Sequence, residues 1–242
     1  MNNVVVHDVC EVIAIDEIND KTYFIGLTST NNVNQTVDST PIRGGIGNKR
    51  VTTINNSKDI NFEVTTTLHN DDIYALQSGG LFSDEAINVL RSETKQAVDN
   101  AGSVEVTIDG TPVGEVTVLD KNGKELTGSF TDGKVTITGG QAGQFYTVIY
   151  EEAQPTASVL DLNAEEFPKP HKVQLHTICY DPDTEKVVAD LYWIFDKARP
   201  DGNLTAAYSA GENQQDTINF ICETPIGSTS YGKYVVVPRT TP

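Results

Sequence analysis

Short segments of alternating apolar and polar residues, separated by turn residues, constrain the fold of this chain more than any other feature. Ile60, Phe62 and Val64 occupy every second position, which places them together on one face of a half-buried strand. The region 103–152 reads as a succession of short strands, and its Asn122-Gly123 pair is typical of a tight hairpin turn. The pattern therefore predicts a mainly β chain built from antiparallel hairpins.

Two longer apolar segments are each divided by a polar turn. Residues 4–27 are broken at 19–21, and residues 173–195 are broken after Tyr180 by Asp181-Pro182, which is type I turn chemistry. We expect a β-hairpin in each segment. Two more strands are expected near the end of the chain, at 217–222 and 234–237.

Residues 71–98 are the one region with helical character. The segment 71–79 begins with Asp and ends with Gly, and is long enough for one or two turns. Farther on, Ser83 suits an N-cap, and Asp84 and Glu85 would complement the dipole of a first helical turn. The sequence therefore predicts a main helix at about 83–98 that flanks the β structure.

Residues 28–57 form a polar, turn-rich segment between two predicted strands. A long connection of this composition is usually functional or disordered. Its Gly44 to Arg50 stretch does not match a phosphate-binding loop, because Asn48 separates Gly47 from Lys49. We interpret the stretch as a basic loop tip suited to docking on an acidic neighbour.

The chain is strongly acidic, with a formal net charge of −17 over 242 residues. Phosphate binding requires Lys and Arg, so this charge argues against a protein that grips nucleic acid. It is compatible with a surface past which DNA slides, and equally with ordinary surface charge that keeps a protein soluble. The length suffices for one large β domain or two modest ones.

No arrangement of residues indicates catalysis. The cysteines Cys10, Cys179 and Cys222 are widely spaced, which fits neither a zinc site nor a redox motif. The acidic turn 181–185 lacks the glycine and distal glutamate of a calcium loop, so a solvated hairpin turn is favoured. We predict a protein that is not an enzyme and has no cofactor and no metal. Without a signal peptide or a stretch of about 20 apolar residues, a cytoplasmic origin without membrane contact is the simplest account.

Three segments in the last third are more specific than composition. Residues 189–198 form an apolar strand with the only tryptophan, Trp193, followed at once by 199–203; residues 208–220 are a turn leading into a strand; and 232–238 form a final apolar segment. Together with Phe167-Pro168-Lys169-Pro170 and Pro41-Ile42-Arg43-Gly44-Gly45, they resemble the structural proteins of tailed bacteriophages. The chain is most similar to the tail tube, or major tail, proteins.

That resemblance implies a single tail-tube-like β domain over residues 1–242, a sandwich or barrel flanked by a helix. Subunits of that family form six-membered rings that stack into a hollow tube. The segment 28–57 would be an extended loop reaching a neighbouring subunit or ring, and 103–152 a β-rich insert or part of the sandwich. The loop residues expected to make the contact are Asn31, Asn32, Pro41, Arg43, Gly44, Gly45, Gly47, Lys49 and Arg50.

The resemblance also implies partners and a location. The chain would assemble with itself in the virion tail, after synthesis in the host cytoplasm, and would meet the tape measure and other tail proteins. An acidic lumen would let genomic DNA pass without specific binding. Two other readings stay open: a monomeric β-sandwich that binds or decorates, and another virion component such as a capsid or tail completion protein.

Overall fold

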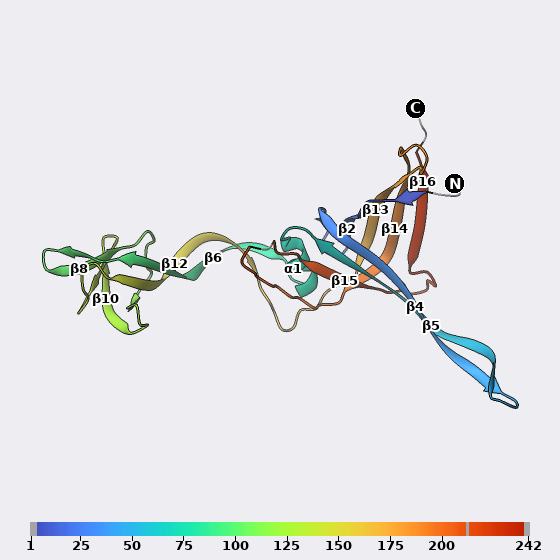
Figure 1. Cartoon of the computed structure of the whole chain (residues 1–242), viewed down its shortest axis with the longest axis horizontal. Coiled ribbons are helices and arrows are strands. Elements are labelled where there is room, and N and C mark those ends of the chain that lie inside the picture. Colours follow the sequence, from blue (N-terminus) through green and yellow to red (C-terminus); the bar gives the residue numbers. More distant parts are fainter. Residues whose placement is uncertain (1–3, 212, 240–242) are drawn as a thin grey trace. The chain divides into compact units, whose positions relative to one another are not determined.

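The computed structural model describes residues 4–211 and 213–239, and the chain divides into two compact units. Unit 1 combines the chain up to Leu81 with the chain from Asp161 onward, and unit 2 is Phe82–Leu160. Each unit contains its own antiparallel sheet (Figure 1). The prediction of a mainly β chain with antiparallel sheets is confirmed, and neither sheet closes into a barrel.

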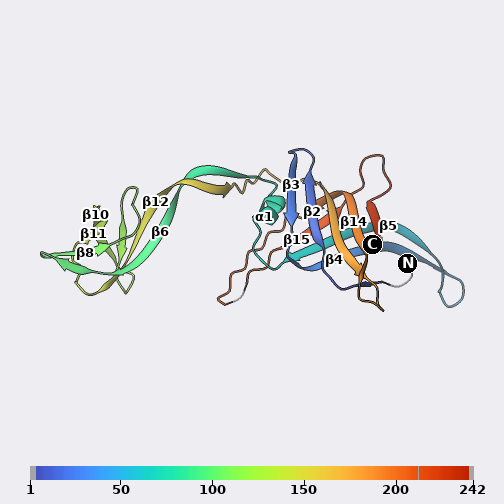
Figure 2. The same ribbon diagram turned by 90° about the horizontal axis from the view of Figure 1, so that it is seen from above.

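Unit 1 is built on a nine-stranded sheet in the order β3-β2-β13-β14-β15-β5-β4, with β1 paired to β13 and β16 paired to β14 (Figure 2). The hairpins expected in 4–27 and 173–195 are confirmed as β2–β3 and β13–β14. The strands are β1 (Val5–Val6), β2 (Glu11–Asp16), β3 (Lys21–Ile25), β4 (Thr28–Gly44), β5 (Lys49–Thr66), β13 (His171–Tyr180), β14 (Val187–Pro200), β15 (Thr217–Cys222) and β16 (Gly232–Pro238).

Aromatic stacking across three strands forms the centre of the unit 1 core. The ring of Phe62 on β5 stacks on Phe195 of β14 and on Phe220 of β15, with centroids 4.9 and 4.7 Å apart. Phe62 and Val64 are fully buried, which confirms the alternation predicted for this strand. Burial of such large apolar side chains is the main favourable term in folding.

The short helix α1 (Asp71–Ser78) packs against this core. It starts where the side chain of Asn70 accepts a hydrogen bond from the amide of Asp72, and it ends at Gly79, which has φ 80°. A Cβ at Gly79 would also collide with the carbonyl oxygen of Phe167, so only glycine fits. The prediction of a one- to two-turn helix at 71–79 is therefore confirmed.

Unit 2 contains a seven-stranded sheet in the order β6-β12-β9-β10-β11-β8-β7. Its separate core includes the fully buried Val106, Val118, Val135 and Val148. The strands are β6 (Phe82–Gln96), β7 (Val98–Asn100), β8 (Ser103–Thr107), β9 (Thr117–Leu119), β10 (Glu125–Thr131), β11 (Lys134–Ile137) and β12 (Phe145–Leu160).

The helix predicted at about 83–98 is wrong, because residues 82–96 form strand β6. This strand pairs with β12 along its whole length, from Phe82 opposite Leu160 to Gln96 opposite Phe145. Ser83, expected as a helix cap, instead donates a hydrogen bond of 2.6 Å to Glu85. Local helix propensity is a weak preference, and a long strand partner in register overrides it.

A partly buried carboxylate fixes one loop of unit 2 to β6. Glu93 accepts hydrogen bonds from the amides of Asp109 and Gly110 and from the hydroxyl of Tyr150. Burial alone would raise the pKa of Glu93, but these hydrogen bonds and nearby Lys95 outweigh it and lower the pKa. Glu93 therefore stays ionised and holds the loop after β8 in place.

In unit 1 a second carboxylate ties the end of the chain to the sheet. Asp190 on β14 accepts hydrogen bonds from both Nε and Nη2 of Arg239, at 2.7 and 2.6 Å, and one of 2.9 Å from His176. The bonds from Arg239, and next that from His176, hold the pKa of Asp190 well below its usual value.

We predict that Asp190→Asn lowers the free energy of unfolding by about 1–3 kcal/mol at pH 7, because charge-assisted hydrogen bonds are lost. The folded-state pKa is depressed, so the stabilisation is complete above roughly pH 4 and disappears as the pH falls through the folded value. Urea unfolding at several pH values measures this. Asp196→Asn, on the exposed part of the same strand, is the control and should change little. A variant difference that persists undiminished in acid would contradict the assignment.

Candidate assembly surfaces

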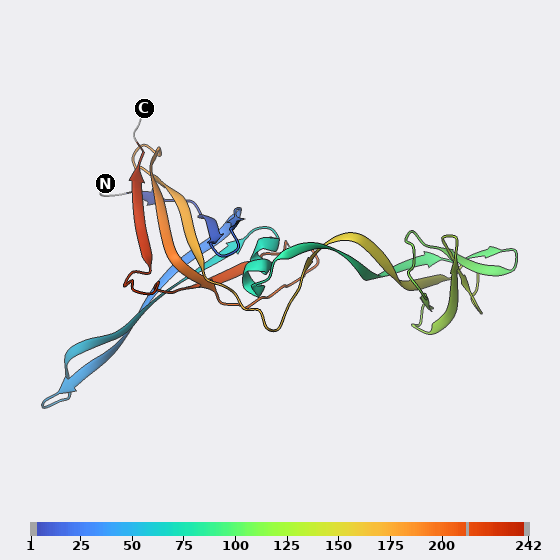
Figure 3. The ribbon, with the colours of Figure 1, turned by 180° about the vertical axis from the view of Figure 1, so that it is seen from behind.

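A two-stranded arm extends from the sheet of unit 1. β15 pairs with β5 only from Asn61 to Thr65, whereas β4 and β5 stay paired with each other out to Gly44 opposite Lys49. Within the described chain, residues 35–60 thus have no third strand beside them (Figures 1 and 3), and we call them the arm. An isolated hairpin is marginally stable in water, so contact with another surface would stabilise the arm.

The segment 28–57, expected as an extended loop, is mostly paired strand, with a short turn at its end. Gly45 and Gly47 have φ values of 76° and 83°, and the amide of Asn48 bonds to the carbonyl of Gly45 at 3.1 Å. Glycine adopts these left-handed conformations without strain. A strand follows the turn, so the helix start that a phosphate-binding loop needs is absent from this place.

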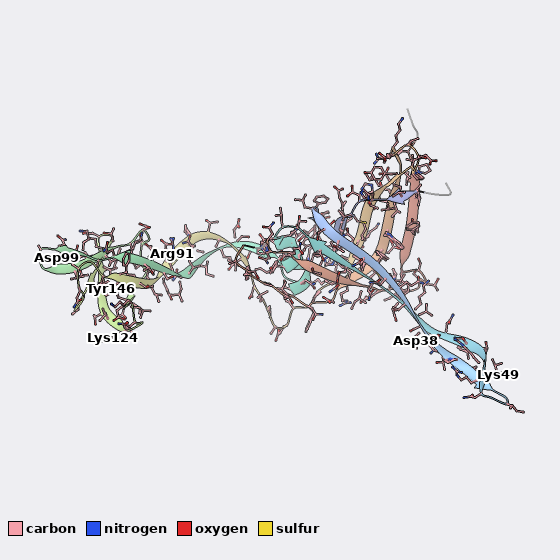
Figure 4. All side chains as sticks on the ribbon, viewed as in Figure 1. Asp38, Lys49, Arg91, Asp99, Lys124 and Tyr146 are labelled. Atoms are coloured by element: carbon pink, nitrogen blue, oxygen red, sulfur yellow. The ribbon has the colours of Figure 1, made fainter. Side chains whose placement is uncertain are left out.

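Basic side chains gather at the arm tip, which we define as residues 43–50. Arg43 lies directly opposite Arg50 in the ladder, and Lys49 lies opposite Gly44; Figure 4 labels Lys49 near the tip and Asp38 farther back. Like charges placed opposite each other destabilise a strand pair. Arg50 Nε donates a hydrogen bond of 2.8 Å to the hydroxyl of Thr53, which is a neutral partner. The tip therefore carries uncompensated positive charge on an acidic chain.

The nine residues predicted from the sequence fall into two groups. Pro41, Arg43, Gly44, Gly45, Gly47, Lys49 and Arg50 all lie in the distal arm. Asn31 and Asn32 lie near its base, opposite Val64 and Glu63. Asn31 accepts hydrogen bonds from the amide of Cys10 at 2.7 Å and from Thr28 at 3.2 Å, so it joins two parts of the same unit.

Sequence reasoning missed the apolar side chains of the arm. Ile46, between the two turn glycines, is 100 % exposed, and Val51 is 70 % exposed. Ile42 and Ile54 are also exposed. The sequence could have indicated a contact surface here, because these four large aliphatic residues lie in a polar, basic segment and do not increase solubility.

Four strands of unit 1, β1, β3, β4 and β16, pair with one strand each in the described chain, and β3 and β16 are the two outside the arm and the short β1. β3 pairs only with β2, and β16 pairs only with β14. β16 exposes apolar side chains on both faces, with Tyr234 54 % and Val237 45 % exposed, and Phe24 on β3 is 53 % exposed. Apolar edges of this kind favour pairing with another chain.

The polar clusters that resemble catalytic groups have structural roles. Buried Asp216 accepts hydrogen bonds from the amide of Asn70 at 2.8 Å and from the hydroxyl of Tyr74 at 3.2 Å, which fastens the start of α1 to the segment before β15. His69 lies 3.0 Å from the same carboxylate. Burial, and next the charge of Asp216, raises the pKa of Tyr74 to about 12, so this hydroxyl remains protonated.

The cysteines and the acidic turn show no sign of reactivity either. Burial raises the pKa of Cys10 to about 11 and that of Cys222 to about 12, so both remain thiols near neutral pH. Asp181 accepts bonds from the amides of Asp183 and Thr184, as in an ordinary hairpin turn. Across residues 4–211 and 213–239 no three His, Cys, Asp or Glu side chains gather as metal ligands would.

A search of the described residues for a helix long and apolar enough to cross a membrane finds none.

Comparison with known proteins gives consistent matches. The model of the YomU/Tube protein family matches residues 4–237. The tail tube protein of Bacillus phage SPR is 28 % identical over 220 residues, covering 89 % of this chain and 82 % of that protein. The SPbeta prophage-derived uncharacterized protein YomU of Bacillus subtilis strain 168 is 26 % identical over 161 residues, covering 66 % of this chain and 59 % of that protein.

The family match spans nearly the whole chain, and it agrees with the resemblance to tail tube proteins found in the sequence. That prediction is confirmed: the chain belongs to the YomU/Tube protein family.

Proposed function

We propose that this chain is a structural subunit of a phage tail tube, which assembles with itself into stacked hexameric rings through which DNA is ejected. It acts in the virion tail after assembly in the host cytoplasm, has no enzymatic activity, and meets the tape measure and other tail proteins at the ends or in the lumen of the tube. The similarity to a protein named tail tube protein, over 89 % of this chain, supports the role.

The observation that carries the proposal is the open sheet of unit 1. β3 and β16 present free backbone edges, and apolar side chains stand beside them. Joining unlike edges of neighbouring copies satisfies both rows of backbone groups. A repeated contact between unlike surfaces closes into a ring when its rotation permits. Six copies follow from the family resemblance.

The arm supplies a second contact in this proposal. It extends beyond the ladder that β5 shares with β15, and its own pairing is weakened by Arg43 opposite Arg50. Contact with a neighbouring subunit or ring would bury its apolar side chains and neutralise its charge. The acidic remainder of the chain suits a lumen that repels DNA, because a basic lining would hold the phosphates.

Unit 2 is proposed as a β-rich insert that the tube wall does not require. It has its own core, and its two ends are partners in one ladder, Phe82 opposite Leu160. Such partners lie about 5 Å apart, so the chain leaves unit 1 and returns to it at nearly the same point.

Negative-stain electron microscopy of the purified protein tests the proposal directly, with tubes or rings around a central hole as the expected result. We predict that Val237→Lys on β16 prevents tubes, because a charge on an apolar edge disfavours strand pairing. Val113→Lys in unit 2 is the matched control, since both valines are 45 % exposed. Monodisperse wild-type monomers at high concentration would instead favour a binding or decoration module, and another particle shape would favour a different virion component.

We predict that shortening the arm also abolishes polymerisation and leaves a folded monomer. Asp38 and Ser57 are ladder partners, so an Asn-Gly turn can replace residues 39–56 between them. This change keeps Asn31 and its bond to Cys10, unlike removal of the whole segment 31–56. Circular dichroism and thermal unfolding check the fold, and microscopy checks assembly. Tubes formed by the shortened chain would refute the role of the arm.

We predict that tubes still form when unit 2 is removed. A Gly-Asn-Gly linker can join Leu81 to Asp161, because the two excised ends are adjacent. Microscopy should then show a tube wall of unchanged inner diameter. A folded, monomeric product would mean that unit 2 belongs to the wall.

A further inference from the structure

The arm tip contains the only described arginines that lack a carboxylate partner. Arg91, Arg199 and Arg239 each form an ion pair with Glu152, Glu223 and Asp190 respectively. Arg43 and Arg50 form none among residues 4–211 and 213–239, although they face each other. From 39 to 58 the sequence has four basic residues and no acidic one. This distribution favours an anionic partner outside the chain.

The tip also carries an apolar knob. The side chain of Ile46 is 100 % exposed at the end of the turn, between Gly45 and Gly47. Polar residues dominate surface turns, so a fully exposed isoleucine flanked by basic side chains fits a partner that is apolar in the middle and acidic at the rim.

A depression with that character lies elsewhere on unit 1. Its volume is about 480 Å³, and Val5, His7, Tyr180, Asp181, Pro182 and Glu185 line it. β1 and the turn between β13 and β14 form its walls, and we call it the β1 pocket. Val5, an apolar lining residue, is 44 % exposed and therefore accessible.

The acidic rim of the β1 pocket is free to pair. Glu185 lines the pocket, and Asp183 lies in the same turn beside the lining residues Asp181 and Pro182. Both side chains are exposed, and neither forms an ion pair within the described part of the chain. Asp181 stays ionised, because the amide and hydroxyl of Thr184, and next the amide of Asp183, lower its pKa. Lys186, of opposite charge, directly follows Glu185.

Figures 1 and 3 show the far end of the β4–β5 ribbon and the blue strand β1, which contributes to the pocket, at separate places on unit 1. We infer that the arm tip of one copy docks into the β1 pocket of a second copy, with Ile46 entering the pocket and Arg43 and Arg50 facing Asp183 and Glu185. This inference rests on the proposed self-assembly, and it names the surface that receives the arm. Because the two surfaces are unlike, the contact propagates from copy to copy.

Charge exchange tests the contact. Arg43→Glu with Arg50→Glu reverses the tip, and Asp183→Lys with Glu185→Lys reverses the rim. Each double variant should raise the protein concentration needed for tube formation by roughly tenfold or more, since like charges then meet. The chain with all four changes should regain tubes, which also shows that the changes do not prevent folding. Sedimentation and electron microscopy measure both results.

Matched controls separate this contact from general charge effects. Lys121→Glu with Lys124→Glu makes the same change of charge as the tip variant. Glu125→Lys with Asp132→Lys makes the same change as the rim variant. All four side chains are exposed in unit 2, and Glu125 is the first residue of β10. Neither should alter assembly. Raising the salt concentration from 0.1 to 1 M shortens the screening length from about 10 to 3 Å and should weaken wild-type tubes.

The outcomes are distinct. If the wild-type chain never forms rings or tubes, the proposed function fails. If it forms tubes, and both reversed variants also form them at wild-type concentrations, the arm has another occupant, such as DNA or a different tail protein, and the pocket assignment is overturned. Loss of assembly in each reversed variant without recovery in the fourfold variant also overturns it. Normal assembly of an Ile46→Asp variant would show that Ile46 does not enter the pocket.

Discussion

Backbone hydrogen bonding between antiparallel strands governs both the stability of this molecule and its capacity to associate. Each strand carries backbone donors and acceptors along both edges, and the central strands of both sheets pair them with neighbouring strands. The outer strands of unit 1 do not, within the described residues. Between Lys233 and Pro238, β16 adds exposed apolar side chains to its free edge, which favour pairing with another chain. The core of the sheet is packed, whereas the backbone groups on its outer edges have no partner strand in the described part of the chain.

Packing inside each unit is strong enough to leave those edges open. The stacked rings of Phe62, Phe195 and Phe220 join strands that are far apart in sequence, and α1 closes one side of the core. Two partly buried carboxylates, Glu93 and Asp190, tie a loop and the segment around Arg239 to their sheets. These contacts are internal to one unit or the other, so a neighbouring copy is not needed to hold either core together.

The sequence predicted the parts of the fold that depend on local patterns. Alternation identified β5, turn residues identified β2–β3 and β13–β14, and an Asp start with a Gly stop identified α1. The region 83–98 failed because its few apolar residues satisfy a helical spacing as well as a strand. Pairing with β12 makes this region a strand, and β12 begins nearly 50 residues after β6 ends. The basic arm tip was predicted from Gly44 to Arg50. Two features could not be predicted from neighbouring residues alone. Arg43 and Arg50 face each other because of the β4–β5 register, and Asn31 bonds to Cys10, which lies 21 residues earlier.

The opposed arginines at the arm tip have a consequence for the symmetry of any assembly. Two copies meeting tip to tip would bring four arginines together, and that encounter is repelled. A symmetric dimer of that kind could not grow further through its arms, because both arm tips would already be occupied. Repulsion at the tip removes it from competition and leaves contacts between unlike surfaces. A polymer grown from such contacts has two different ends. The charge of one hairpin would therefore give the polymer a direction along which it grows and along which a molecule passes through it.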